Sequence, residues 1–429
     1  MSKVFSSLAF FLCCSFFIPA FDLPKAPLRP KVLVFTSNIG GGHKSPTEAI
    51  AAALKDQYEI ETVNFSEKIA AFIEPVSKIT KNEYNAEQFF SFIARQGWNG
   101  LANQISEYSL KKLDAEKLDA ELEKALLSYL KKTKPDLVIS VIGFVNYPIA
   151  RATDKLKIPF IIIPTDLDQT IANHGFQKKL GKPAEKGFPF LVYAPAFDHF
   201  EINKTIRPFS FPLKQIKPIG FPLRPQFFEK KDPAALKNAW QIPSGKPVIM
   251  LLLGALGGNN TYDWAKAISK LNRPLHLIVC IGSNETLGKK LQSLKTGHGF
   301  SMTVVKYTPK IADLMSLSDL LIIKPGTNSV LEALACRKPI LVDLTNGEPL
   351  KIEQFNCLFL KQYQLGCLAR KKEDLAALLK KPKLPAPRNN PLEISDSFAA
   401  NLSDLVRSLL KKAEKTENSP PSQASGLKN

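Results

Sequence analysis

The chain has 429 residues, which favours two or three domains at about 100–200 residues per domain. Its composition, 45% hydrophobic and 23% charged, excludes wholesale disorder and a polytopic membrane protein. The formal net charge of +19 favours an anionic partner such as a membrane surface or a phosphorylated ligand. No zinc-ligand spacing and no aromatic RNA-binding pattern is present, so we expect no nucleic acid partner.

The first 30 residues form an apolar leader. Residues 4–21 carry no charge, and a run of about 18 residues is at the short limit for a membrane-spanning helix. The segment also resembles a signal peptide that is cleaved after Ala20. Lys3 is outnumbered by the basic residues that follow the run, so an uncleaved leader would leave the body in the cytoplasm. We expect a membrane-associated protein on the cytoplasmic face, with export through a cleaved signal peptide as the alternative.

From Lys31 onward, short apolar runs alternate with helical patterns. The runs are rich in β-branched residues and do not alternate in polarity, which is typical of parallel strands buried on both faces. This order of strands and helices predicts the α/β class. The predicted strands are Val32–Phe35, Leu137–Ile142, Phe160–Ile163, Phe190–Tyr193, Val248–Leu253, Leu275–Ile281, Met302–Val305, Leu320–Ile323 and Ile340–Val342. Among the predicted helices are Ala49–Leu54, Leu113–Leu130, Trp264–Leu271 and Val330–Ala335.

A Pro-rich, charged segment divides the body into two halves, each long enough to bury its own core. We therefore predict an N-terminal Rossmann-like domain over 31–225 and a linker over 226–244. A second Rossmann-like domain, with a C-terminal helix, follows over 245–413. The last residues, 414–429, have little apolar content, and we expect them to be disordered.

A Gly-rich loop follows the first predicted strand, in the string Thr36-Ser-Asn-Ile-Gly-Gly-Gly-His-Lys-Ser-Pro-Thr-Glu. Ser45 and Glu48 have the spacing of a capping box, with Pro46 at the first helical position. The loop is therefore expected at a helix N-terminus, which favours an anion or developing negative charge. It carries His43. Three glycines that make only a tight turn, beside a surface histidine, are the alternative interpretation.

A second loop follows the strand Leu320–Ile323, in the string Lys324-Pro-Gly-Thr-Asn-Ser-Val-Leu-Glu. Ser329 and Glu332 again have capping-box spacing, which predicts a helix from about Val330. Glu332 has two interpretations of nearly equal weight, as a cap carboxylate or as an acceptor from ribose hydroxyls. A third turn, at Gly254, follows the first strand of the second half, where α/β folds bind ligands, but it departs from the G-x-G-x-x-G pattern.

These strings resemble a known group of enzymes. Gly40–His43 resembles the N-terminal signature of the monogalactosyldiacylglycerol synthases. Lys324-Pro325-Gly326, with Glu332 eight residues after the lysine, resembles the donor-site signature of the wider glycosyltransferase group. That group includes the transferase that adds N-acetylglucosamine to the undecaprenyl-linked peptidoglycan precursor. The resemblance runs from about Lys31 to about Leu379 and so covers most of the body.

Further strings support this resemblance. They are Pro135-Asp136, Pro164-Thr165-Asp166, Gly220–Pro225, and Glu353 with Asn356, an E-x-x-N string that contacts the donor sugar in the group. There are also departures. Ile352 stands where the group usually has Gln, and Thr327 replaces the second glycine of the donor loop. His174 lies eight residues after Asp166, farther than the group's usual spacing.

The resemblance implies a GT-B fold, in which two Rossmann-like domains face each other across a cleft. It implies a UDP-sugar donor on the C-terminal domain and an acceptor mainly on the N-terminal domain. No cofactor and no metal is implied, because a helix dipole and backbone donors take the charge of the leaving diphosphate. The substrate-binding residues expected are Gly40, Gly41, Gly42, Gly254, Lys324, Gly326, Thr327, Asn328, Ser329, Glu332, Glu353 and Asn356.

The expected reaction is an in-line displacement with inversion, in which the acceptor hydroxyl loses its proton as UDP leaves. His43 is the preferred base, because an imidazole titrates near neutral pH. Asp166 is the second candidate, or it orients the acceptor. The segment Glu87–Leu113 is interpreted either as an amphipathic membrane contact or as an ordinary core-packing helix.

The preferred function is transfer of a hexose from a UDP-sugar to diacylglycerol at an anionic membrane surface. Alternatives are transfer of N-acetylglucosamine to a polyprenyl diphosphate and a non-catalytic relative that binds UDP or lipid. A UDP-sugar epimerase on the same fold lacks support, because no acid/base pair is evident on both sides of the sugar.

Overall fold

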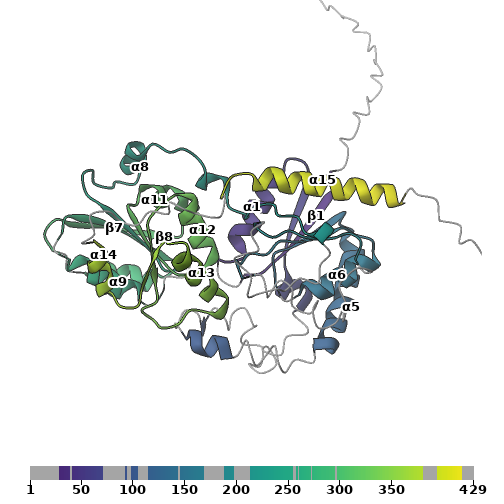
Figure 1. The fold of residues 1–429 in the computed structure, drawn as a ribbon, viewed down its shortest axis with the longest axis horizontal. Coiled ribbons are helices and arrows are strands. Elements are labelled where there is room, and N and C mark those ends of the chain that lie inside the picture. The colour runs from purple at the N-terminus through teal and green to yellow at the C-terminus, as the bar shows by residue number, and fades with distance from the viewer. Residues whose placement is uncertain are drawn as a thin grey trace, which may run out of the picture.

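The computed structural model describes thirteen segments of the chain, and they contain two parallel β-sheets in separate lobes (Figure 1). The described residues are 29–38, 41–70, 92–93, 98–104, 115–143, 145–168, 188–197, 213–254, 258, 260–271, 273–294, 297–379 and 394–417. Most of the leader, Gly40 and His174 lie outside them. No helix in these segments is long and apolar enough to cross a membrane.

The first sheet has the strand order β2-β1-β3-β4-β5 and the second β11-β10-β9-β6-β7-β8, with every pair parallel. The strands of the first sheet are β1 (Lys31–Thr36), β2 (Glu59–Asn64), β3 (Leu137–Ser140), β4 (Phe160–Ile162) and β5 (Leu191–Tyr193). Those of the second are β6 (Val248–Leu252), β7 (Leu275–Gly282), β8 (Phe300–Lys306), β9 (Leu320–Ile323), β10 (Ile340–Asp343) and β11 (Cys367–Ala369). The α/β prediction is therefore confirmed.

Two strands were not predicted from the sequence, and both lie at sheet edges. β2 has the polar sequence Glu-Ile-Glu-Thr-Val-Asn, and its first four residues are exposed or half-buried. β11 has only three residues. An edge strand pairs on one side only, so neither segment needs the continuous apolar run that revealed the central strands.

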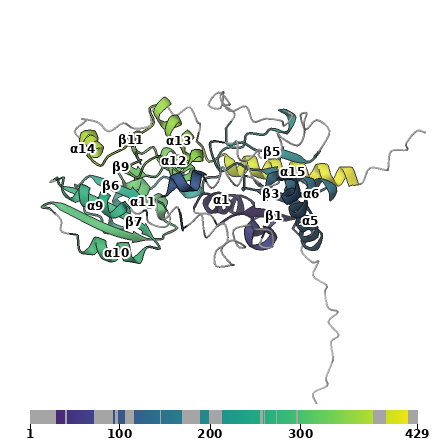
Figure 2. The same cartoon turned by 90° about the horizontal axis from the view of Figure 1, so that it is seen from below.

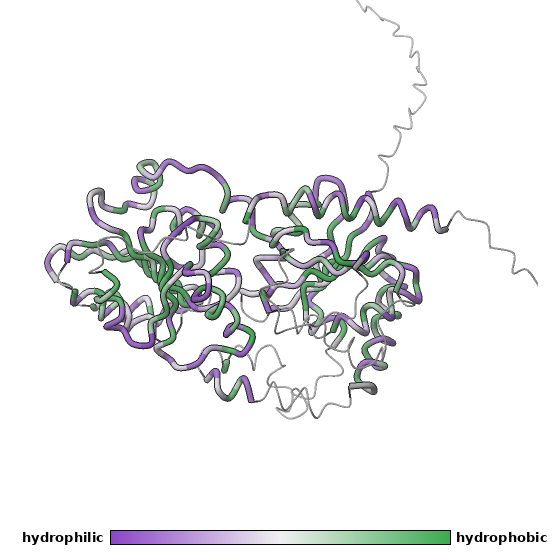
Figure 3. The backbone as a smooth tube through the Cα atoms, in the orientation of Figure 1, coloured by the Kyte–Doolittle hydropathy of each residue, from purple (hydrophilic) through white to green (hydrophobic). Residues whose placement is uncertain are grey.

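Helices connect the strands and cover both sheets, as parallel crossovers require. In the first lobe they are α1 (Lys44–Leu54), the π-helix η1 (Ser66–Ala70), α5 (Ala115–Thr133) and α6 (Asn146–Lys155). The connection between lobes contains η4 (Leu213–Gln215), η5 (Pro225–Phe227) and α8 (Pro233–Ala239). The second lobe contains α9 (Thr261–Ser269), α10 (Glu285–Gln292), α11 (Ile311–Leu317), α12 (Thr327–Ala335), α13 (Lys351–Gln362) and α14 (Glu373–Leu379), and α15 (Phe398–Glu417) follows. Apolar residues are concentrated in the two sheets (Figure 3).

Helix α15 returns to the first lobe. The C-terminal helix predicted as part of the second domain lies instead along α1 (Figure 1). Phe398, Leu402 and Val406 are buried in one cluster with Val32 and Ile50. The helix also continues to Glu417, so residues 414–417 are helical rather than disordered. The apolar stripe of α15 finds its partner on the first sheet, which chain order alone does not reveal.

The segment predicted as a linker is partly folded onto the second lobe. It contains α8, and its Phe227 and Ile242 are buried in the core beside Val248 and Leu321. Leu167 and Ala196, from the first lobe, belong to the same cluster. The lobes therefore share apolar contact close to the carboxyl ends of their strands, and α1 and α12 lie near this junction (Figure 2).

Candidate active site

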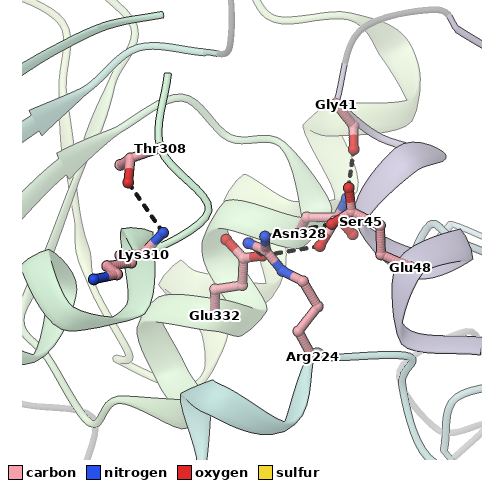
Figure 4. A network of polar contacts seen from close by, with 8 residues as sticks. All are labelled: Gly41, Ser45, Glu48, Arg224, Thr308, Lys310, Asn328 and Glu332. Carbon is pink, nitrogen blue, oxygen red and sulfur yellow. Dashed lines mark hydrogen bonds and ion pairs between the residues drawn. The ribbon is translucent and has the colours of Figure 1, made fainter. Parts of the chain in front are cut away.

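The two loops singled out in the sequence meet across the junction of the lobes. The side-chain amide of Asn328 donates hydrogen bonds to the carbonyl oxygens of Gly41 and Gly42, each at 3.0 Å. Figure 4 shows Asn328 facing Gly41. Gly41 and Gly42 precede α1, and Asn328 lies in the first turn of α12. One side chain of the second lobe therefore fixes the backbone of the Gly-rich loop of the first.

The cap predicted for α1 is wrong. The helix begins at Lys44, with His43 at the N-cap position, and the His43 carbonyl accepts bonds from the Thr47 amide at 3.1 Å and its hydroxyl at 2.7 Å. Ser45 is therefore inside the helix, and its hydroxyl donates to Glu332 Oε1 at 3.2 Å instead. Because the helix starts two residues before the predicted proline, the residues that resembled a capping box are available for contacts across the cleft.

The cap predicted for α12 is wrong for a similar reason. The helix begins at Thr327 with Gly326 at the N-cap position, so Ser329 is its third residue. The Glu332 carboxylate is buried, and it accepts from Ser45 and from the Arg224 guanidinium at 3.3 Å. Arg224 also reaches Glu48 at 3.5 Å (Figure 4). Arg224 thus joins carboxylates from both lobes.

The environment of Glu332 changes its acidity. Burial raises the pKa of this carboxyl to about 7, while Arg224 and Ser45 act in the opposite direction and Glu48 adds to the increase. Burial and the neighbouring Arg224 thus act against each other, and the pKa of the Glu332 carboxyl lies near neutral pH. Such perturbed groups are more common at functional sites than elsewhere.

His43 lies beside the loop that follows β4 and carries Asp166. The His43 ring nitrogen Nδ1 lies 3.4 Å from the hydroxyl of Thr165, the residue before Asp166. Burial raises the pKa of Asp166 to about 7, a hydrogen bond from Thr327 lowers it, and the charges of Glu353 and Asp168 raise it. The two residues predicted to act on the acceptor therefore lie beside one strand end.

Lys324, Gly254 and Glu353 form the floor of the second lobe's site. Gly254 has a φ of +101°, which disfavours any side chain, and a Cβ there would lie 3.5 Å from Cδ of Lys324. A Cβ on Gly326 would lie 3.7 Å from the Glu353 carboxylate. Burial raises the pKa of Glu353, and the nearby Lys324 ammonium lowers it. The close packing at the two glycines leaves the Lys324 ammonium near the Glu353 carboxylate.

An open pocket lies over this floor, and it contains polar residues that sequence reasoning missed. It is lined by Asn99, Gly258, Asn260, Lys324, Pro325, Asp343, Leu344, Asn346, Gly347, Pro349 and Glu353. Asn260 ends the Gly-rich turn that begins at Gly254 and donates to Asp343, at the end of β10. These two positions follow strands, which is a signal available in the sequence. Asn99 comes from the N-terminal half of the chain, and no pattern in the sequence places it here.

The structure places two predicted ligand contacts inside the protein. The Thr327 hydroxyl donates to Asp166 Oδ1 at 3.1 Å, so it bonds to a carboxylate of the first lobe. The Asn356 amide donates to the Pro325 carbonyl at 2.6 Å and to Thr327 at 3.0 Å. Both side chains support the donor loop from behind in this conformation. Among the described residues, no group of three or more His, Cys, Asp or Glu side chains has the spacing to hold a metal ion.

Comparison with known proteins identifies enzymes of the group that the sequence motifs resemble. No protein-family model matches the chain. It is 23% identical over 319 residues to the processive diacylglycerol beta-glucosyltransferase of Bacillus cereus (strain G9842), covering 73% of this chain and 76% of the relative. The protein of the same name from Bacillus mycoides (strain KBAB4) matches at the same identity and coverage. The chain is a glycosyltransferase.

Solved structures confirm the GT-B fold of this glycosyltransferase. Acinetobacter baumannii MurG matches with a TM-score of 0.55 and 16% identity, covering 88% of this chain and 99% of that one. Arabidopsis thaliana UGT89C1, crystallised with quercetin, matches with a TM-score of 0.50 and 15% identity, covering 89% and 100%. The two parallel sheets and the cleft between them are therefore those of the GT-B architecture, and the overall resemblance to the monogalactosyldiacylglycerol synthase group holds.

Proposed function

We propose that this glycosyltransferase moves a hexose from a UDP-sugar to a membrane lipid, with diacylglycerol as the preferred acceptor. The observation that carries the proposal is the contact between Asn328 and the Gly41–Gly42 backbone, which joins the loop before His43 to the donor loop, beside a polar pocket. The Bacillus relatives, which are named for glucosyl transfer to diacylglycerol, support the choice of lipid.

The second lobe supplies the donor site in this proposal. A diphosphate would be held by the Lys324 ammonium and the N-terminus of α12, where unpaired backbone amides and the helix dipole favour negative charge. Glu332 would accept from the ribose hydroxyls, since a carboxylate has more acceptor sites than Ser45 and Arg224 use at Oε1. The hexose would occupy the polar pocket beside Glu353.

The first lobe supplies the chemistry. His43 would remove the proton from the acceptor hydroxyl as that oxygen attacks the anomeric carbon, and UDP would leave from the opposite side with inversion. Asp166 would orient the acceptor, or act as the base if His43 does not. The anionic charge that develops on the leaving diphosphate would be stabilised by fixed donors of α12, which need no reorganisation during the step.

We propose that the enzyme works at an anionic membrane on its cytoplasmic side. The net charge of +19 supports attraction to such a surface. Trp98 and Leu101 also expose 50% and 43% of their surface to solvent, as side chains that contact a membrane would. Ile93 and Ala102, in the same part of the chain, are buried, so this region has both an apolar exposed side and a packed side. The leader would add a second attachment.

A turnover assay on the full-length protein tests the proposal. The assay offers UDP-glucose, UDP-galactose and UDP-N-acetylglucosamine, each with diacylglycerol vesicles that contain anionic lipid, and measures UDP release and the lipid product. We expect UDP release that depends on diacylglycerol and yields a glycolipid. Transfer to a polyprenyl diphosphate instead would contradict the acceptor, and UDP binding without transfer to either lipid would contradict catalysis on both.

A further inference from the structure

Two consecutive hydrogen bonds, one buried and one partly buried, connect the donor loop with Asp166 at the junction of the lobes. This chain of hydrogen bonds starts at Asn356 on α13, passes through the Thr327 hydroxyl at the start of α12, and ends on Asp166 Oδ1 in the first lobe. Asn356 is 0% exposed and Thr327 is 5% exposed. The Asn356–Thr327 bond, of 3.0 Å, is therefore shielded from water, which strengthens it, and the Thr327–Asp166 bond, of 3.1 Å, is partly buried.

The direction of this chain is fixed by its first member. The Asn356 amide nitrogen lies 2.6 Å from the Pro325 carbonyl, which can only accept, so this nitrogen is a donor and not a flipped oxygen. The same nitrogen faces Thr327, whose hydroxyl must then accept from it. A hydroxyl carries one proton, so that proton is directed to Asp166. The Thr327 hydroxyl consequently favours the ionised, accepting form of the carboxylate.

The far end of the chain reaches the region of His43. Asp166 follows Thr165, whose hydroxyl contacts the His43 ring. Other charged groups near Asp166 are Glu353 of α13, which faces Lys324, and Asp168 in the same loop, and both carboxylates oppose its ionisation. The hydrogen bond from the Thr327 hydroxyl acts in the opposite direction and favours the ionised form of Asp166.

We propose that Thr327 is a positioning residue that orients and ionises Asp166 from across the cleft, coupling the donor loop to the acceptor side of the reaction. The expected change in kcat rests on the proposed function, whereas the expected change in the pKa of Asp166 does not. It also explains why this chain has Thr327 at the position of the second glycine in the donor loop of the enzymes that it resembles. Glycine has no hydroxyl to donate to Asp166.

The deciding variant is Thr327→Val, which replaces the hydroxyl by a methyl of similar size and keeps the backbone amide of α12. Without the hydroxyl, Asp166 loses its donor, and its pKa, already raised to about 7, rises further. We expect the acidic limb of the pH profile of kcat to move up by about one pH unit, a tenfold change in the ionisation constant. Thr327→Ser, which retains the donor, should return the limb to its original position.

The control is Thr153→Val, in α6. The Thr153 hydroxyl is also buried, but it bonds only to carbonyls of its own helix, at Ile149 and Ala150. This variant loses a buried hydroxyl away from the cleft, so stability falls without movement of the pH profile. If Thr327→Val is not obtained folded, Thr327→Ala carries the same expectation.

A second readout separates this inference from the proposed function. Aspartate carboxyl carbons are labelled with 13C, and the signal absent from Asp166→Asn is followed through a pH titration in each variant. An upward shift in Thr327→Val but not in Thr327→Ser or Thr153→Val supports the inference, even if no lipid is glycosylated. An unchanged titration of Asp166 in Thr327→Val overturns it, even if the enzyme transfers hexose to diacylglycerol.

Discussion

The two loops that face each other across the cleft have the same place in their lobes but differ in construction. Each follows a buried strand and leads into a helix, α1 or α12. In the first, Gly41, Gly42 and Lys44 are exposed. In the second, Thr327 and Glu332 are each 5% exposed and their polar groups are bonded to residues of the other lobe. The first loop therefore exposes its glycine backbone and the Lys44 side chain, and the second directs the Thr327 and Glu332 side chains inward.

This difference suits two separate tasks. A donor site must keep dipoles fixed while charge develops on the leaving group, and burial with many partners provides that rigidity. In the proposed function, the base would approach a lipid hydroxyl, so its loop would benefit from exposure and from few constraints. Asn328, which bonds to Gly41 and Gly42, then fixes the open loop with respect to the rigid one.

The largest expected effect comes from the open loop. His43→Asn keeps a residue that is favoured at an N-cap, so α1 should form as before. Loss of a general base lowers kcat by about 10²–10⁴-fold. UDP affinity, measured by calorimetry, should stay within about twofold, because the donor contacts lie in the other lobe.

The control for this variant is His298→Asn. His298 precedes β8 and so lies at the opposite end of its sheet from the cleft, where a parallel sheet carries no site. Equal turnover in His43→Asn and His298→Asn would end the assignment of base catalysis to His43. A loss of UDP binding in His43→Asn would show that the two loops do not divide the work as described.

The next effect tests the buried loop through its ion pair. Arg224→Met leaves the buried Glu332 carboxylate without its cation, which costs about 3–5 kcal/mol of the free energy of unfolding. Arg370→Met is the matched control, because the Arg370–Glu348 pair is exposed, with side-chain exposures of 66% and 62%, and solvent screens such pairs so that they add little to stability. Urea unfolding of both variants measures the difference.

The pH dependence of that loss has a definite sign. The folded pKa of Glu332, about 7, is above its value in an unfolded chain, so between pH 4.5 and 7 the folded state holds more protons. Stability from this group therefore falls as pH rises through that window. Without Arg224 the folded pKa rises further, so the penalty of Arg224→Met should be smaller at pH 6 than at pH 8. A penalty independent of pH would contradict a charged Glu332 in the buried loop.

The sequence predicted the class of fold and the two loops because both depend on local patterns. Central strands such as β9 are apolar throughout, and the glycines after β1 and β9 are visible in any reading of the chain. The capping boxes failed because Ser45 and Glu332 have the right spacing for a local bond but contact each other instead. Spacing shows which local bonds are possible, and tertiary contacts decide which are made.

The contributions of distant segments were beyond prediction for the same reason. Asn99 lies in the pocket although it is about 250 residues away in the chain from Glu348, whose carbonyl accepts from its amide at 3.3 Å. α15 crosses back to α1, although about 350 residues separate them in the chain, because its apolar stripe fits that helix. Neither contact has a periodicity or motif that reports its partner.

A smaller effect tests how the loops are fixed to each other. Asn328→Ala removes the donors to the Gly41 and Gly42 carbonyls, and we expect kcat/KM to fall about tenfold, as for loss of one to two hydrogen bonds. Asn328→Asp should be worse, because its carboxylate faces two carbonyl oxygens and repels them. Transfer rates under subsaturating donor measure both. If Asn328→Asp equals or exceeds Asn328→Ala, the amide does not hold the open loop.

The smallest expected effect comes from Lys44, which neighbours His43 but has a different role. Its ammonium lies 4.8 Å from the centre of the Tyr307 ring, after β8 of the other lobe, and both side chains are exposed. An exposed cation–π contact contributes about 0.5–1 kcal/mol, so Lys44→Gln should lower stability by no more than that and leave kcat within about twofold. Lys44→Arg should retain the contact. A loss of kcat in Lys44→Gln as large as that in His43→Asn would mean that the open loop carries two catalytic groups. Loss of so weak a contact at the rim of the cleft would not otherwise change kcat by that much.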